Sequence, residues 1–87
     1  MVTKELKVNC PIGLLVKPAG VVCQAAMEFK SHITIEYEGG EANAKSMLSL
    51  LGAAIKDQDV VRIICDGTDE NEAAEMIADL LEHRLAG

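Results

Sequence analysis

Apolar and polar residues alternate in two stretches of this chain, and that pattern restricts the fold more than any other feature. Over residues 2–10, Leu6, Val8 and Cys10 share one face of an extended strand. Over residues 32–38, the positions expected to face inward are Ile33, Ile35 and Tyr37. Because strands of this kind are half-buried, we expect a sheet with one covered face and one face in water.

Two further strands are indicated between turn signals. Residues 60–65 are mostly β-branched, which is typical of a strand, and the Asp-Gly pair at 66–67 turns the chain. A Gly-Gly pair at 39–40 suits a two-residue hairpin turn. A short strand over residues 41–44 would then complete the hairpin.

Helical spacing marks two segments that separate these strands. The first helix is predicted over residues 17–29, where Pro18 is tolerated in the first turn. Its core-facing residues are Ala19, Val22, Ala26 and Phe29. Ser46 precedes the apolar run 47–51 and is predicted to be the N-cap of a short helix that ends near Gly52 or soon after it.

The last helix begins at Thr68 or Asp69. Asp69, with Glu72 three residues later, resembles a capping box. The apolar stripe of this helix consists of Ala73, Ala74, Ile77, Leu80 and Leu81. His83 and Arg84 follow near its C-terminus, where positive charge suits the helix dipole. The order β-α-β-β-α-β-α predicts one α+β domain over residues 1–87, a sheet with helices on one face.

Composition excludes several classes of function. The net charge is −6 and no basic cluster is present, so we expect neither nucleic-acid nor membrane-surface binding. Three widely spaced cysteines without a C-x-x-C pair indicate reduced thiols. No signal-peptide pattern opens the chain, and a cytoplasmic protein is expected. No metal-ligand spacing or nucleotide-binding glycine loop appears, so we expect no metal and no cofactor.

With these elements in place, the chain resembles the HPr family, the histidine-containing phosphocarriers of the bacterial sugar phosphotransferase system. The resemblance covers nearly the whole length. It rests on Gly13, Lys17-Pro18-Ala19, Asn43-Ala44-Lys45-Ser46, the apolar helix that follows, and the segment Gly67–Ala73. It implies an HPr-like open-faced sandwich, in which three helices cover one face of a four-stranded antiparallel sheet.

The resemblance also shows where this chain departs from the family. The family's active-centre pattern is roughly G-I-H-A-R-P-A, and the chain has Gly13-Leu14-Leu15-Val16-Lys17-Pro18-Ala19. Leu15 therefore falls on the phosphoryl-accepting histidine, and Lys17 falls on the arginine. Phosphoryl relay requires an imidazole nitrogen, which Leu15 lacks. His32 and His83 are expected to lie far from position 15. We expect a protein that neither carries phosphohistidine nor acts as an enzyme.

A second site of the family is kept. Ser46 matches the regulatory serine, which a dedicated HPr kinase/phosphorylase modifies in some bacteria, and the modified form binds a LacI-type regulator in carbon catabolite control. The catabolite-repression HPr-like branch also lacks the histidine and keeps the serine. The resemblance therefore implies a regulatory protein that binds this regulator or another metabolic protein. Lys17 and Lys45 are the expected anion contacts.

Two alternatives remain open. Ser46 can be an N-cap and nothing more, in a module that binds its partner without phosphorylation. Leu14, Leu15 and Val16 are either packed in a structural turn or exposed. In the second case we predict an apolar interaction patch that consists of Leu14, Leu15, Val16, Met47, Leu48 and Leu51. The last alternative is a phosphocarrier that uses Cys10 or Cys23 as its acceptor.

Overall fold

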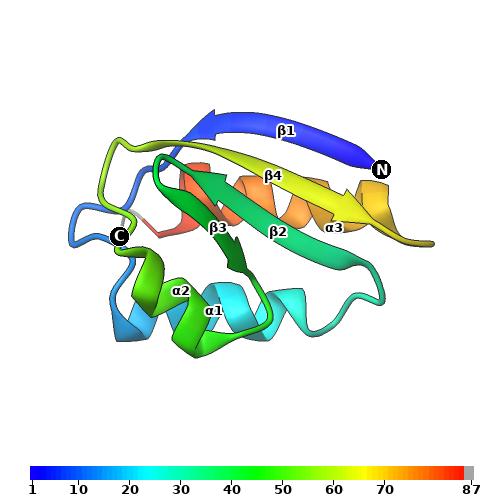
Figure 1. Cartoon of the computed structure of the whole chain (residues 1–87), viewed down its shortest axis with the longest axis horizontal. Coiled ribbons are helices and arrows are strands. Elements are labelled where there is room, and N and C mark those ends of the chain that lie inside the picture. Colours follow the sequence, from blue (N-terminus) through cyan, green and yellow to red (C-terminus); the bar gives the residue numbers. More distant parts are fainter. Residues whose placement is uncertain (86–87) are drawn as a thin grey trace.

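The structure, a computed structural model, describes residues 1–85 and has the predicted order of elements (Figure 1). Its strands are β1 (Val2–Lys7), β2 (His32–Tyr37), β3 (Gly40–Asn43) and β4 (Val60–Asp66). Its α-helices are α1 (Val16–Ala26), α2 (Met47–Ala53) and α3 (Glu70–Asp79), and α3 continues into a π-helical turn, η1 (Leu80–Arg84).

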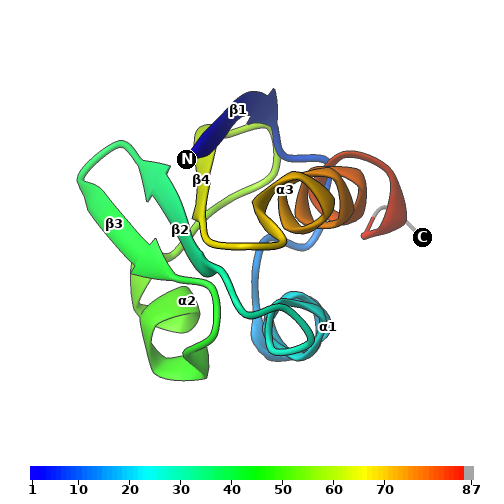
Figure 2. The same cartoon turned by 90° about the vertical axis from the view of Figure 1, so that its right-hand side faces the viewer.

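The four strands form one antiparallel sheet in the order β1-β4-β2-β3. The long strand β4 therefore lies between the first two strands of the chain, and β1 and β3 are the edges. All three helices cover the same face of the sheet (Figure 2). This arrangement confirms the predicted open-faced sandwich.

The buried face carries the alternating apolar residues that the sequence predicted. Leu6, Ile33 and Ile35 are buried, and Ile63 of β4 pairs with Ile35 in register. The buried stripe of the last helix is confirmed at Ala73, Ala74, Ile77, Leu80 and Leu81. Because burying one aliphatic side chain contributes roughly 1.5–3 kcal/mol, this face supplies most of the driving force for folding.

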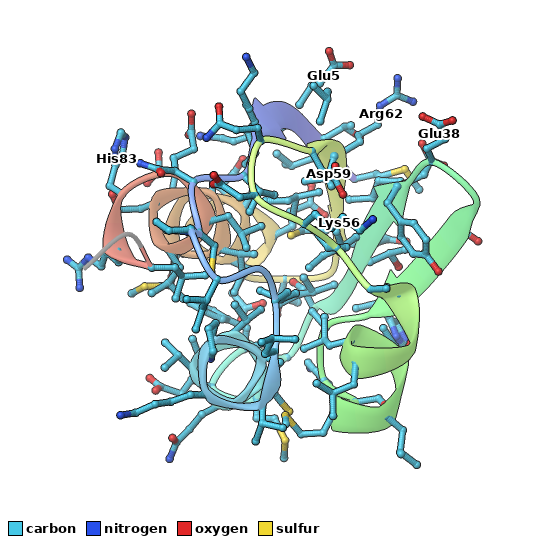
Figure 3. The ribbon with its side chains drawn as sticks, turned by 90° about the vertical axis from the view of Figure 1, so that its left-hand side faces the viewer. Glu5, Glu38, Lys56, Asp59, Arg62 and His83 are labelled. Carbon is cyan, nitrogen blue, oxygen red and sulfur yellow. The ribbon has the colours of Figure 1, made fainter. Side chains whose placement is uncertain are left out.

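The opposite face of the sheet is open and charged. Arg62 lies between Glu5 and Glu36 in register, with its guanidinium 3.3 Å from Glu36 Oε1 and 3.8 Å from Glu5 Oε1. Figure 3 shows Glu5 and Arg62 pointing away from the helices. Exposed pairs of this kind stabilise the fold by at most about 1 kcal/mol each, so this face needs no cover but adds little stability.

Several predicted boundaries are wrong by a few residues. The hairpin turn is Glu38-Gly39 rather than Gly39-Gly40, because Tyr37 pairs with Gly40. Gly39 supplies the positive φ, at +110°. The end of the short helix is predicted correctly, because α2 ends at Ala53, directly after Gly52, and Ala54 adopts the left-handed conformation that closes it.

The first strand and first helix are also shorter than predicted. β1 ends at Lys7, and beyond it the Val8 N–H donates to Asp59 O in the loop before β4. Cys10 remains buried, as predicted, outside the strand. α1 ends at Ala26, so Phe29 packs against the core from the loop that follows.

The predicted capping box at the start of α3 is wrong. Asp69 is the residue before the helix, but its side chain caps nothing there. Its carboxylate instead accepts hydrogen bonds from the backbone N–H groups of Lys30 (2.8 Å) and Ser31 (3.0 Å) and from the Ser31 hydroxyl (2.5 Å). Ser31 is fully buried, so these donors need a partner, and the carboxylate joins the α1–β2 loop to α3.

This contact predicts an acid-sensitive fold. The hydrogen bonds from Ser31 and Lys30 lower the pKa of Asp69 from 3.8 to about 2. The contribution of Asp69 to stability is therefore complete above about pH 4 and is lost as the pH falls toward 2. In Asp69→Asn, we expect a lower urea midpoint at pH 7 and a smaller further loss between pH 4 and pH 2 than in the unaltered protein.

Glu72→Gln is the matched control, because the Glu72 side chain makes no hydrogen bond within residues 1–85. Its urea midpoints should follow those of the unaltered protein at every pH. If Asp69→Asn loses as much stability between pH 4 and pH 2 as the unaltered protein does, Asp69 is not the cause of the acid sensitivity.

Candidate functional site

The segment before α1 directs successive apolar side chains to opposite sides. Gly13 adopts φ +80° and donates its N–H to Cys10 O (2.7 Å). Leu14 then donates to Ile55 O (2.9 Å) and is only 2 % exposed. Leu15 and Val16 turn outward and are 59 % and 67 % exposed. Leu15, the residue that the sequence resemblance aligns with the phosphoryl-accepting histidine, is thus accessible at the start of a helix.

One residue of the predicted interaction patch, Leu14, is therefore not on the surface. Leu14 is part of the core and cannot contact a partner, because the left-handed turn at Gly13 directs it inward. Leu15, Val16 and Leu48 are exposed, with Leu48 at 84 %, while Met47 and Leu51 are half-buried against the core.

The five remaining patch residues lie on or beside two neighbouring helices. α1 and α2 lie side by side, as Figure 2 shows. At the other end of α1 from Leu15, Met27 is a further exposed apolar side chain, 66 % exposed, that sequence reasoning did not single out. The sequence gives one indication of this exposure, because Met27 follows Ala26, the last buried residue of α1.

Ser46 occupies the predicted N-cap of α2. Its Oγ accepts a hydrogen bond from the Ser49 N–H at 3.2 Å. The loop around it is held by further bonds, since Ser49 Oγ accepts from Asn43 N–H (2.8 Å) and Asn43 Oδ1 accepts from Lys45 N–H (2.9 Å). Ser49 was expected to be a solvated helix residue, but both its N–H and its Oγ take part in these loop hydrogen bonds. The serine thus sits in a loop of defined shape.

The two candidate anion contacts differ in their surroundings. The Lys45 ammonium donates to the carbonyl of Phe29 at 2.6 Å, so it ties the Ser46 loop to the segment after α1. Lys17 is exposed, and its ammonium has no hydrogen-bond or ion-pair partner within residues 1–85. Lys17 is therefore the more available of the two for an anion.

The thiols are unsuited to phosphoryl transfer. Cys10 is fully buried, its Sγ donates to Gly13 O (3.1 Å), and burial together with the charge of Asp57 raises its pKa. Cys23 is also buried. A nucleophilic cysteine needs an exposed, electropositive setting that favours the thiolate. The burial of both side chains contradicts the alternative that uses one of them as an acceptor.

Neither of the two histidines lies beside Leu15. His32 begins β2, which starts near the C-terminal end of α1, away from Leu15 (Figure 1). His83 lies in η1 and points away from α1 (Figure 3). Within residues 1–85, no group of three potential ligands could hold a metal ion, and no helix is long and apolar enough to cross a membrane.

Comparison with known proteins identifies the family. The family described as "PTS HPr component phosphorylation site" matches residues 2–83. Among curated proteins, the HPr-like protein Crh of Halalkalibacterium halodurans is 38 % identical, with 94 % of this chain and 98 % of that protein covered. The phosphocarrier protein HPr of Mycoplasma pneumoniae is 35 % identical, with 90 % of each chain covered.

Solved structures show the same fold. The crystal structure of HPr-C-His from Thermoanaerobacter tengcongensis superposes with a TM-score of 0.93 and 29 % identity, covering 100 % of this chain and 98 % of that one. The crystal structure of Crh from Bacillus subtilis superposes with a TM-score of 0.75 and 34 % identity, covering 93 % of both chains.

The tie between Lys45 and Phe29 can be measured through stability. Lys45→Met keeps most of the aliphatic stem but removes the donor to the Phe29 carbonyl. We expect a loss of about 1 kcal/mol in the free energy of unfolding, because hydrogen bonds to charged groups are among the stronger ones and this site is partly exposed. Lys30→Met is the matched control and should change stability by less than about 0.5 kcal/mol. Equal losses of unfolding free energy in the two variants would show that the hydrogen bond from Lys45 to Phe29 does not stabilise the fold. The readout is urea denaturation.

Proposed function

Since this chain belongs to the HPr family of the phosphotransferase system, we propose that it is a regulatory member that carries no phosphohistidine and is switched by phosphorylation of Ser46. The observation that carries this proposal is the contrast between two sites. The Ser46 loop is fully formed, while the accessible side chain at the start of α1 is Leu15, a hydrocarbon.

Position 15 supports a loss of the carrier step. Phosphoryl relay forms a bond between phosphorus and an imidazole nitrogen, and Leu15 has no atom that can make one. Lys17 retains a positive charge there but lacks the planar fork with which arginine holds a phosphate in two places. The protein would then act through binding rather than through group transfer.

The Ser46 loop supports a local switch. A phosphoryl group adds about 1.5–2 negative charges and three acceptor oxygens. At the N-cap of α2 these oxygens lie where the first N–H groups of the helix need acceptors, so the charge is tolerated without refolding. A partner could read this charge together with Met47 and Leu48 next to it.

The proposed partners follow from the family. The modifying enzyme would be an HPr kinase/phosphorylase, and the phosphorylated form would bind a LacI-type catabolite regulator or a metabolic enzyme in the cytoplasm. Two of the curated relatives, from Halalkalibacterium halodurans and Bacillus subtilis, are named HPr-like protein Crh. The Bacillus subtilis protein is described with its crystal structure as a catabolite repression protein.

Intact-mass spectrometry tests the switch directly. After incubation with HPr kinase and ATP, we expect one added phosphate on the unaltered protein and none on Ser46→Ala, because only that variant lacks the acceptor oxygen. Ser49→Ala is the matched control, since it removes a hydroxyl three residues away in the same loop. It should still accept one phosphate.

The outcome is interpretable only with an active kinase, so an ordinary HPr is phosphorylated in parallel. No added phosphate on this chain under those conditions would refute the switch. Phosphate that persists in Ser46→Ala would place the modification at another residue.

The exposure of the patch favours a second candidate function, a binding module that needs no phosphorylation. Leu48 is 84 % exposed and Leu15 is 59 % exposed, and exposed apolar side chains on adjoining elements are typical of protein contacts. In this reading Ser46 only caps α2, a role that contributes about 0.5–2 kcal/mol to stability.

A binding comparison separates the two functions. Once the regulator or enzyme partner is identified, its affinity for Ser46→Ala and Leu15→Asp is measured by calorimetry without kinase. The module predicts unchanged binding in Ser46→Ala and at least about tenfold weaker binding in Leu15→Asp, because a carboxylate would be buried in an apolar contact. The switch predicts that tight binding appears only after phosphorylation.

A further inference from the structure

A groove runs between the start of α1 and the C-terminal turn η1. It has a volume of about 290 Å³ and lies beside Pro11. Its remaining lining residues are Ile12, Lys17, Pro18, Val21, Arg84 and Leu85. No residue of α2 lines it, so the groove is separate from the Ser46 loop.

The lining combines an apolar floor with two cations. Ile12 is 63 % exposed and Val21 is 44 % exposed, which leaves aliphatic surface uncovered on both sides of the groove. Among the lining residues that the structure describes, the charged ones are Lys17 and Arg84, both positive, although the chain as a whole has a net charge of −6. The groove is thus a positively charged, apolar site on an acidic protein.

Both cations are available to an incoming anion. Lys17 has no ion-pair partner among residues 1–85, and Arg84 pairs through Nε with Asp79 Oδ2 at 2.9 Å. Both side chains of that pair are well exposed, and such pairs contribute little to stability. A carboxylate from another molecule can therefore replace Asp79 at little cost.

The size of the groove restricts what it can hold. Pockets for small molecules and cofactors usually enclose about 300–1,000 Å³, and this one is at the lower limit and open to solvent. It suits one or two aliphatic side chains rather than a nucleotide or a sugar phosphate.

We propose that the groove binds a short segment of a partner protein in which aliphatic side chains stand next to carboxylates. The aliphatic groups would pack on Val21, Ile12 and Leu85, and the carboxylates would pair with Lys17 and Arg84. This binding does not require a phosphate on Ser46, so the groove gives the protein a second contact with a partner. Because the cations are exposed, the affinity falls as salt is added.

Peptide titration followed by ¹H–¹⁵N NMR tests the groove. The probe is the blocked peptide Ac-Glu-Leu-Leu-Asp-NH₂, and its neutral counterpart is Ac-Gln-Leu-Leu-Asn-NH₂. We expect shifts of the amide signals of Ile12, Val21 and Leu85, and binding about tenfold weaker for the neutral peptide, since it loses both ion pairs. Equal affinity of the two peptides would overturn the proposed chemistry.

Three variants locate the binding on the surface. Val21→Asp places a carboxylate on the apolar surface of the groove and should weaken binding by about tenfold, whereas Arg84→Gln removes one of the two ion pairs and should weaken it by about threefold. Leu48→Asp is the matched control in the neighbouring patch and should bind as the unaltered protein does. The dispersion of the NMR spectrum verifies that each variant is folded.

Two results would overturn the proposal. One is the absence of groove shifts at millimolar peptide. The other is a set of shifts centred on Leu15 and Leu48 that disappears in Leu48→Asp, which would assign the peptide to the patch of the proposed function. Phosphorylation of Ser46 is measured separately, so its failure leaves the groove test intact.

Discussion

The whole arrangement depends on covering one face of a sheet with almost no aromatic residues. Phe29 and Tyr37 are the only aromatic side chains, and both are just half-buried at the margin of the core. The cover must therefore come from aliphatic residues packed closely. Alanines such as Ala19, Ala26 and Ala73 are fully buried and allow the helix backbones to approach the strands. With three helices held on one face, the start of α1 and the Ser46 loop are left on the surface.

Sequence reasoning succeeded where one local pattern decides the structure and failed where distant groups compete. The alternation in β1 and β2 predicted the buried face, because a strand's side chains have a fixed period. The capping box failed because the carboxylate of Asp69 finds better donors in the loop at Lys30 and Ser31. The sequence around Asp69 does not indicate these donors, because they lie 38 and 39 residues before it in the chain.

The candidate site shows the same limit at closer range. A run of three apolar residues has no period, so the pattern could not tell Leu14, which is buried, from Leu15, which is exposed. The positive φ of Gly13 and the hydrogen bond from Leu14 N–H to Ile55 O determine which of the two side chains points into the core. The N-cap at Ser46 was predictable because capping depends on groups only three residues apart.

The geometry of the α1 segment separates residues that belong to the framework from residues that belong to the surface. Gly13 sets the turn and Pro18 is buried, so both belong to the framework. Leu15 and Lys17 point into solvent, where a new side chain disturbs no packing and costs the fold little. The side chains at these two positions therefore affect what the surface can bind more than how the chain folds, and α1 faces the Ser46 loop on one side and the cationic groove on the other.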